Sequence, residues 1–101
     1  MTKYIVYTKE KGKIETDNWR DFECLTRHRV DGSAMQRFHD NGQLTYKAYF
    51  INDKLHRLDG PAYQTFHDNG ELNHKSYYIN GIYYSKFEYD VEIFKMKLAL
   101  L

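Results

Sequence analysis

Two copies of a His-Arg pair, His28-Arg29 and His56-Arg57, are the side chains of this 101-residue chain that most invite a chemical interpretation. Each pair opens the pattern His-Arg-x-Asp-Gly, and imidazoles in a repeated position could act as acid–base groups or metal ligands. However, two strands of separation correspond to about 9–10 Å, whereas a metal ion holds histidine nitrogens at about 2.0–2.1 Å. The spacing therefore favours turn chemistry, in which the aspartate accepts backbone N–H bonds and the glycine takes an unusual φ.

The other candidates for chemistry are His39, His67 and Cys24. Both histidines precede Asp-Asn-Gly, so metal binding beside Asp40 or Asp68 is one interpretation, and cross-strand packing next to a turn is the one we favour. The single cysteine allows no internal disulfide and no multi-cysteine zinc site, which indicates a reducing compartment. No phosphate-binding loop or catalytic motif is present. We therefore expect a protein that is not an enzyme, without catalytic residues, metal or cofactor.

The composition indicates a β-rich domain of near-neutral charge. Fifteen basic and fourteen acidic residues are interspersed and give a net charge of +1, whereas a nucleic-acid mimic would be strongly acidic and a general nucleic-acid binder strongly basic. Aromatic residues make up 17% of the chain and proline occurs once, which suits pleated sheet rather than disorder. No apolar run could span a membrane and no signal peptide is recognisable, so we expect a cytoplasmic protein.

A 28-residue internal repeat organises the chain. Residues 28–54 align with residues 56–82, and 16 of the 27 aligned positions are identical. A fixed period of this length indicates one supersecondary unit stacked on copies of itself, because a single unit cannot bury its own apolar face. We therefore divide one domain, residues 1–101, into a degenerate repeat at 1–27, full repeats at 28–55 and 56–83, and a capping helix at 85–101.

The expected fold class is mainly β (α+β), an antiparallel meander of hairpin repeats closed by one C-terminal helix. Asn41-Gly42 and Asn69-Gly70 predict two-residue hairpin turns, in which both central residues take φ > 0. These turns would join residues 33–40 to 43–51 and 61–68 to 71–79, with further turns at Asn52-Asp53 and Asn80-Gly81. In the N-terminal copy we expect a strand at 4–8, a turn at Lys11-Gly12, Ile14 in the position of Leu44, and a bulge or short loop before His28.

An amphipathic helix is predicted over residues 86–100. Ser85 and Glu88 form a capping-box pattern, and we expect the apolar stripe that follows to cover the sheet. This stripe consists of Phe87, Val91, Phe94, Leu98 and Leu101.

Alternation of side chains along the strands defines two faces of the sheet. The face expected under the helix carries Ala34, Phe38, Tyr49 and Ile51, with Ala62, Phe66, Tyr77 and Ile79 as their repeat counterparts. The face expected to stay open carries Met35, Arg37, Leu44, Tyr46 and Phe50, with Tyr63, Leu72, His74 and Tyr78 as counterparts. The first set is identical between the copies, as expected where both must pack on one helix.

The second repeat carries a family resemblance. His-Arg-Leu-Asp-Gly-Pro-Ala at 56–62, Asp-Asn-Gly at 68–70 and Tyr-Tyr-Ile-Asn-Gly at 77–81 resemble the MORN-like repeats of small phage and giant-virus proteins. They are also similar to the looser repeats of bacterial YwqK-type proteins, described as antitoxin-like. The resemblance covers about residues 28–90 and implies a scaffold without catalytic residues. Ser33 and Asp53 depart from the pattern, in which proline and glycine stand at these positions.

The predicted function follows from the face expected to stay open. Aromatic, arginine and histidine side chains are typical of interface hot spots, which favours partner binding by Arg37, Tyr46, Phe50, Tyr63, His74 and Tyr78. Alternatives are burial of this face in a homodimer or in the core, stacking of single-stranded nucleic acid, and binding to a phospholipid membrane surface, which the near-neutral charge disfavours. With the viral resemblance, the specific expectation is a phage-encoded factor that binds and inhibits a host protein, such as a defence nuclease complex or a toxin.

Overall fold

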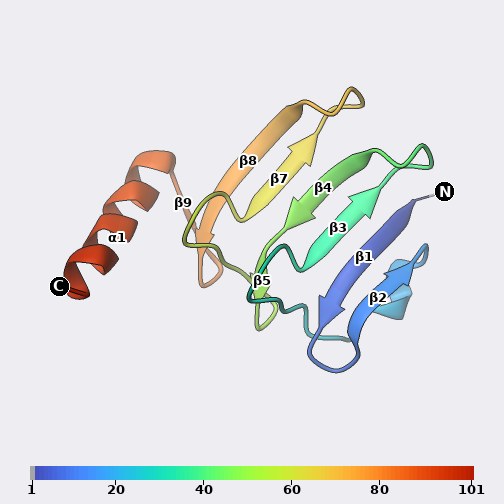
Figure 1. Ribbon diagram of the computed structural model, residues 1–101, viewed down its shortest axis with the longest axis horizontal. Coiled ribbons are helices and arrows are strands. Elements are labelled where there is room, and N and C mark those ends of the chain that lie inside the picture. The colour runs from blue at the N-terminus through green and yellow to red at the C-terminus, as the bar shows by residue number, and fades with distance from the viewer. Residues whose placement is uncertain (1) are drawn as a thin grey trace.

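The computed structural model describes residues 2–101, whose β-rich sequence forms a seven-stranded antiparallel sheet with a helix beyond one end (Figure 1). The elements are β1 (Lys3–Thr8), β2 (Gly12–Thr16), the 3-10 helix η1 (Trp19–Asp21), β3 (Met35–Phe38), β4 (Leu44–Ala48), β5 (Phe50–Ile51), β6 (Lys54–Leu55), β7 (Tyr63–Phe66), β8 (Leu72–Ile79), β9 (Ile82–Tyr84) and α1 (Lys86–Ala99). The prediction of a mainly β, α+β fold with one C-terminal helix is confirmed.

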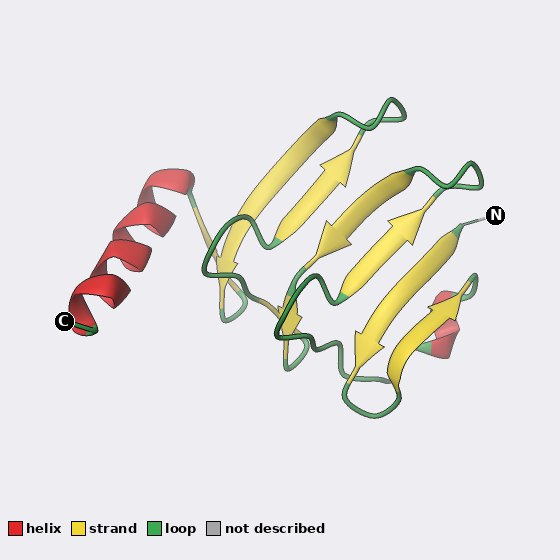
Figure 2. Cartoon of the chain, viewed as in Figure 1, coloured by secondary structure: helices red, strands yellow, loops and turns green. Residues whose placement is uncertain are grey.

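The strands lie in the sheet in the order in which they occur in the chain, except that β2 lies outside β1 at one edge. Its strand order is β2-β1-β3-β4-β7-β8-β9, and β5 pairs with β6 in a separate small sheet. Each full repeat contributes one long hairpin, β3–β4 or β7–β8, and the two hairpins lie side by side with their tips at the same end (Figure 2). The repeat therefore sets the spacing of equivalent side chains across the sheet.

The turn at Asn41-Gly42 differs in type from the two-residue turn that we predicted. The His39 N–H donates to the Gln43 carbonyl and the Gly42 N–H to the His39 carbonyl, both at 2.9 Å, which closes a three-residue loop beside a bulge. Only the glycine takes a positive φ, +84°. Turns with two positive φ angles lie instead at Asn52-Asp53 and Asn80-Gly81, where the strand twist favours them.

The N-terminal strand at 4–8 is confirmed, but its place in the repeat is not the expected one. The Tyr7 N–H donates to the Ala34 carbonyl at 2.7 Å, as the Tyr49 N–H, directly after β4, donates to the Ala62 carbonyl at 2.7 Å. β1 therefore corresponds to β4, the second strand of a repeat. The alignment of Ile14 with the β4 side chains is consequently wrong, because β2 lies beyond β1 at the edge of the sheet.

Residues 17–27, which we call the covering segment, pack on one face of the sheet. Phe22 is 7% exposed, and its ring meets Tyr4 edge-on with centroids 5.3 Å apart. Leu25 packs against the same core. The buried core here consists of Val6, Phe22, Ala34, Met35, Ala48 and Phe50. This is the face that we expected to stay open, and the expectation is therefore wrong over β1, β3 and β4. The bulge or short loop that we predicted before His28 is instead the covering segment.

Helix α1 begins as predicted but packs through a different side. The Glu88 N–H donates to Ser85 Oγ at 3.2 Å and the Ser85 N–H to Glu88 Oε1 at 3.1 Å, which confirms the capping box. Tyr89 is buried against Tyr77 and Ile79 of β8. The prediction that the Phe87 stripe covers the sheet is wrong, because α1 lies beyond β9 rather than across the strands (Figure 1).

Candidate functional site

The repeated His-Arg pairs have structural roles. The Asn52 N–H donates to His28 Nδ1 at 2.9 Å, and the Asn80 N–H donates to His56 Nδ1 at 3.0 Å, so each histidine ties the start of its repeat to a turn 24 residues later. One ring nitrogen of each histidine is thus committed to the backbone. This geometry fits the interpretation of the motif as turn chemistry.

The arginine and the aspartate of each motif bind each other. Arg57 Nε donates to Asp59 at 2.8 Å and its Nη1 to the Pro61 carbonyl at 3.1 Å, while its guanidinium stacks 4.0 Å from the Tyr49 ring centroid. Arg29 repeats these contacts one copy earlier. We predicted that the aspartate would accept backbone N–H bonds. The main donor is the Arg57 Nε–H, and together with the Asp59 backbone N–H it holds the pKa of the Asp59 carboxyl below its ordinary value.

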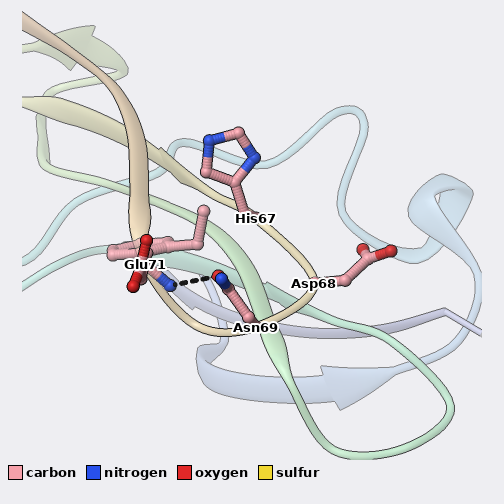
Figure 3. A pocket seen from close by; sticks show the side chains of 5 residues that line it. His67, Asp68, Asn69 and Glu71 are labelled. Atoms are coloured by element: carbon pink, nitrogen blue, oxygen red, sulfur yellow. Dashed lines mark hydrogen bonds between the residues drawn. The ribbon is translucent and has the colours of Figure 1, made fainter.

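The hairpin tips do not assemble a metal site. His67, Asp68, Asn69 and Glu71 line a shallow pocket at the β7–β8 tip, where His67 and Asp68 point in different directions (Figure 3). The Glu71 N–H donates to Asn69 Oδ1 at 3.0 Å, so this amide serves the turn. No group of three or more His, Cys, Asp or Glu side chains within residues 2–101 could hold a metal ion. Cys24 is an exposed free thiol.

The aromatic face of the sheet is divided into two halves. Over β1, β3 and β4 the covering segment lies on it, and Tyr4, Tyr46 and Tyr63 pack against the buried core. Burial raises the pKa of the Tyr46 hydroxyl above its ordinary value. Four of the residues predicted to bind a partner, Arg37, Tyr46, Phe50 and Tyr63, therefore lie in or beside the core, and Phe50 is only 7% exposed.

The same face is uncovered over β8 and β9. We call the side chains of His74, Tyr78 and Tyr83 the uncovered patch. Tyr83 is 62% exposed, and the Tyr78 and Tyr83 rings meet edge-on at 5.6 Å. His74 is exposed and lies 2.7 Å from Ser76 Oγ. The structure thus brings together two of the six predicted site residues, His74 and Tyr78, with Tyr83, which the sequence interpretation did not include as a binding residue.

A second exposed apolar surface lies on α1. We call this surface the helix face. It consists of Phe87, Val91, Phe94 and Leu98, which are 78%, 36%, 61% and 52% exposed. These side chains face away from Tyr89, the side chain that anchors the helix. The sequence interpretation found this stripe but placed it in the core. Its regular spacing of four and three residues was a signal that it could pair with another helix.

Comparisons with protein-family models, with curated proteins and with solved structures found no match to this chain. In the described part of the chain, no helix is long and apolar enough to cross a membrane.

Proposed function

We propose that this protein is a non-catalytic protein-interaction module that contacts its partner through the uncovered patch. The observation that carries the proposal is a contrast within one sheet face. Phe22 of the covering segment is buried in one cluster with side chains of β1, β3 and β4, whereas Tyr78 and Tyr83 of β8 and β9 lie outside that cluster. Tyrosines whose rings are held by neighbours but whose surface remains exposed are common anchors of protein interfaces.

The edge of the sheet beside the patch supports a protein partner rather than a small ligand. β9 pairs only with β8 in the sheet order, so it is an edge strand. Edge strands can accept a further strand, with neighbouring side chains giving specificity. Tyr83 lies on this edge strand and Tyr78 on its neighbour.

In its specific form, the proposal is a small phage-encoded factor that binds and inhibits a host protein in the bacterial cytoplasm. This form rests on the resemblance of the repeats to MORN-like viral proteins. The side chains of the patch are the rings of Tyr78 and Tyr83 and the imidazole of His74. A partner with an apolar surface and few charges suits this chemistry.

The test is affinity capture from a lysate of the bacterial host, followed by measurement of the captured protein's affinity for purified variants. We expect Tyr78→Ala with Tyr83→Ala to weaken binding by about 2 kcal/mol or more, while the thermal midpoint stays close to that of the wild type. Val30→Ala is the matched control, because Val30 is 85% exposed on a different loop. Equal binding by the wild type and the double variant would exclude the patch as the contact surface.

A further inference from the structure

The helix face lies mostly away from the contact of α1 with the sheet, and Phe94 at its border also lines a pocket with Leu58 and Tyr77. Tyr89 and Ile93 hold the helix to β8, and the Tyr89 hydroxyl donates to the Arg57 carbonyl at 2.7 Å and accepts from the Gly60 N–H at 3.2 Å. These contacts fix the rotation of the helix about its axis. Phe87 and Phe94 consequently project into solvent with 78% and 61% of their surface exposed.

The spacing of the helix face is that of a seam between two helices. Phe87, Val91, Phe94 and Leu98 follow one another at intervals of four, three and four residues, the pattern by which apolar side chains of paired helices interlock. In heptad notation Phe87 and Phe94 occupy d positions, and Val91 and Leu98 occupy a positions. The same spacing also suits a helix packed on a sheet, but Tyr89 and Ile93 make that contact here and leave this stripe exposed.

Charged residues flank the seam in two groups of opposite sign. Glu88 and Asp90 lie beside its N-terminal half, and Lys95 and Lys97 beside its C-terminal half. All four are exposed. Asp90 also accepts from Lys86 of the same helix at 2.7 Å and remains 56% exposed, so its carboxylate is still accessible.

We propose that α1 pairs with α1 of a second copy of this chain, antiparallel and about a two-fold axis. In that register Val91 packs against Phe94 of the other copy, and Phe87 packs against its Leu98. The same register places Glu88 opposite Lys95 and Asp90 opposite Lys97, which gives four ion pairs around the axis. The sequence of one helix is therefore complementary to itself, in apolar side chains and in charge, as an isologous contact requires.

The antiparallel direction matches the charges better than the parallel one. Parallel helices would bring Asp90 next to Lys95 of the other copy and leave Glu88 and Lys97 without an opposite charge. They would also align the two helix macrodipoles unfavourably. The pair buries few residues, at the small end of specific interfaces, whose total area is roughly 1,200–2,000 Å², so we expect a dimer of micromolar affinity.

This inference concerns a different surface from the uncovered patch, so either proposal can fail without the other. Sedimentation velocity of the full chain from low micromolar to submillimolar concentration should show a monomer–dimer equilibrium. Phe94→Glu should weaken dimerisation at least about thirtyfold, the effect of losing a buried aromatic anchor. Val30→Glu, on an exposed loop, should leave it unchanged. A wild type that stays monomeric throughout, or a Phe94→Glu variant that still dimerises, would overturn the proposal.

A charge exchange tests the register. Asp90→Lys and Lys97→Glu each turn two attractive contacts into repulsive ones, so each variant alone should dimerise roughly tenfold more weakly. An equimolar mixture of the two should recover wild-type affinity as a heterodimer, because every flanking pair is again opposite in sign. A mixture that associates no better than either variant alone would contradict the antiparallel register, with circular dichroism showing that the helix is intact in both.

A lipid surface is the competing occupant of an exposed apolar helix. Vesicles containing phosphatidylserine distinguish the two, because the acidic Glu88 and Asp90 beside the seam should keep the wild-type chain off an anionic surface. A chain that is monomeric in solution and binds such vesicles, with binding lost in Phe94→Glu, would assign the helix face to membranes and overturn the dimer.

Discussion

The two halves of the aromatic sheet face carry equivalent residues from the two repeats and differ in what lies above them. Tyr46 of the first repeat is half-buried, whereas its counterpart His74 is exposed. Phe50 is 7% exposed, and its counterpart Tyr78 carries a hydroxyl and is more exposed. The second repeat has thus become more polar at the positions where the covering segment ends.

This difference shows that the repeat alone does not decide which side chains form the core. Both repeats build the same hairpin with the same closing hydrogen bonds. The covering segment, which lies outside the two full repeats in sequence, adds Phe22 to the core of the first half. The other half remains exposed at Tyr83 and His74.

The largest effect is expected from removing the centre of the cover. Phe22→Ala deletes a buried ring that packs on Tyr4, and we expect the free energy of unfolding to fall by about 3–5 kcal/mol, the usual cost of Phe→Ala in a core. Trp19→Ala is the control, because Trp19 is 50% exposed on the same segment. Denaturant unfolding measures both. Equal costs for the two variants would mean that the segment does not cover a core.

An exchange between equivalent positions sharpens the comparison. Tyr46→His places a polar ring under the cover beside Tyr4 and Tyr63, so we expect a loss of about 1–3 kcal/mol in unfolding free energy. His74→Tyr, the reverse change in the uncovered half, should alter it by less than about 1 kcal/mol. Equal losses of unfolding free energy in Tyr46→His and His74→Tyr would contradict the difference between the two halves.

The next test concerns the hydrogen bonds that anchor α1 on the sheet, away from the uncovered patch. Tyr89→Phe removes the hydroxyl that binds the backbone of Arg57 and Gly60, and we expect a loss of about 1–2 kcal/mol. Tyr83→Phe changes an exposed ring and serves as the control. Thermal unfolding with no difference between them would show that the hydroxyl does not hold the helix in place.

The smallest effect is a pH dependence confined to the covered half. Because burial raises the pKa of Tyr46 in the folded state, its contribution to stability is complete below about pH 10, the unfolded value, and is lost as pH rises through the folded pKa. Tyr46→Phe should therefore lose less stability than the wild type on going to alkaline pH. Parallel curves of denaturation midpoint against pH would contradict this.

The sequence was sufficient to predict the local structure of the chain, including the fold class and the capping box at Ser85. It was not sufficient for the turn at Asn41-Gly42, because Asn-Gly also fits a three-residue loop in which Asp40 joins the turn and only the glycine needs a positive φ. The choice between the two loops depends on the register of the whole hairpin.

The assignment of faces was right for Tyr77 and Ile79, which pack against α1, and failed for the face expected to stay open, for a tertiary reason. Aromatic side chains alternate onto both faces of these strands, so the pleat alone could not indicate which face the covering segment would occupy. Helix α1 posed the same difficulty, since it is apolar on two sides. Tyr89 packs on the sheet because its hydroxyl finds two backbone partners there, and the more regular apolar stripe is left in solvent.

Hydroxyl-radical footprinting of the chain, alone and with its captured partner, tests the central claim most directly. In the free chain we expect Tyr83 to be oxidised rapidly while Tyr46 and Phe50 are protected by the covering segment, and we expect the partner to protect Tyr83. Oxidation of Tyr46 as fast as Tyr83 in the free chain, or protection by the partner that leaves Tyr83 reactive, would contradict the account.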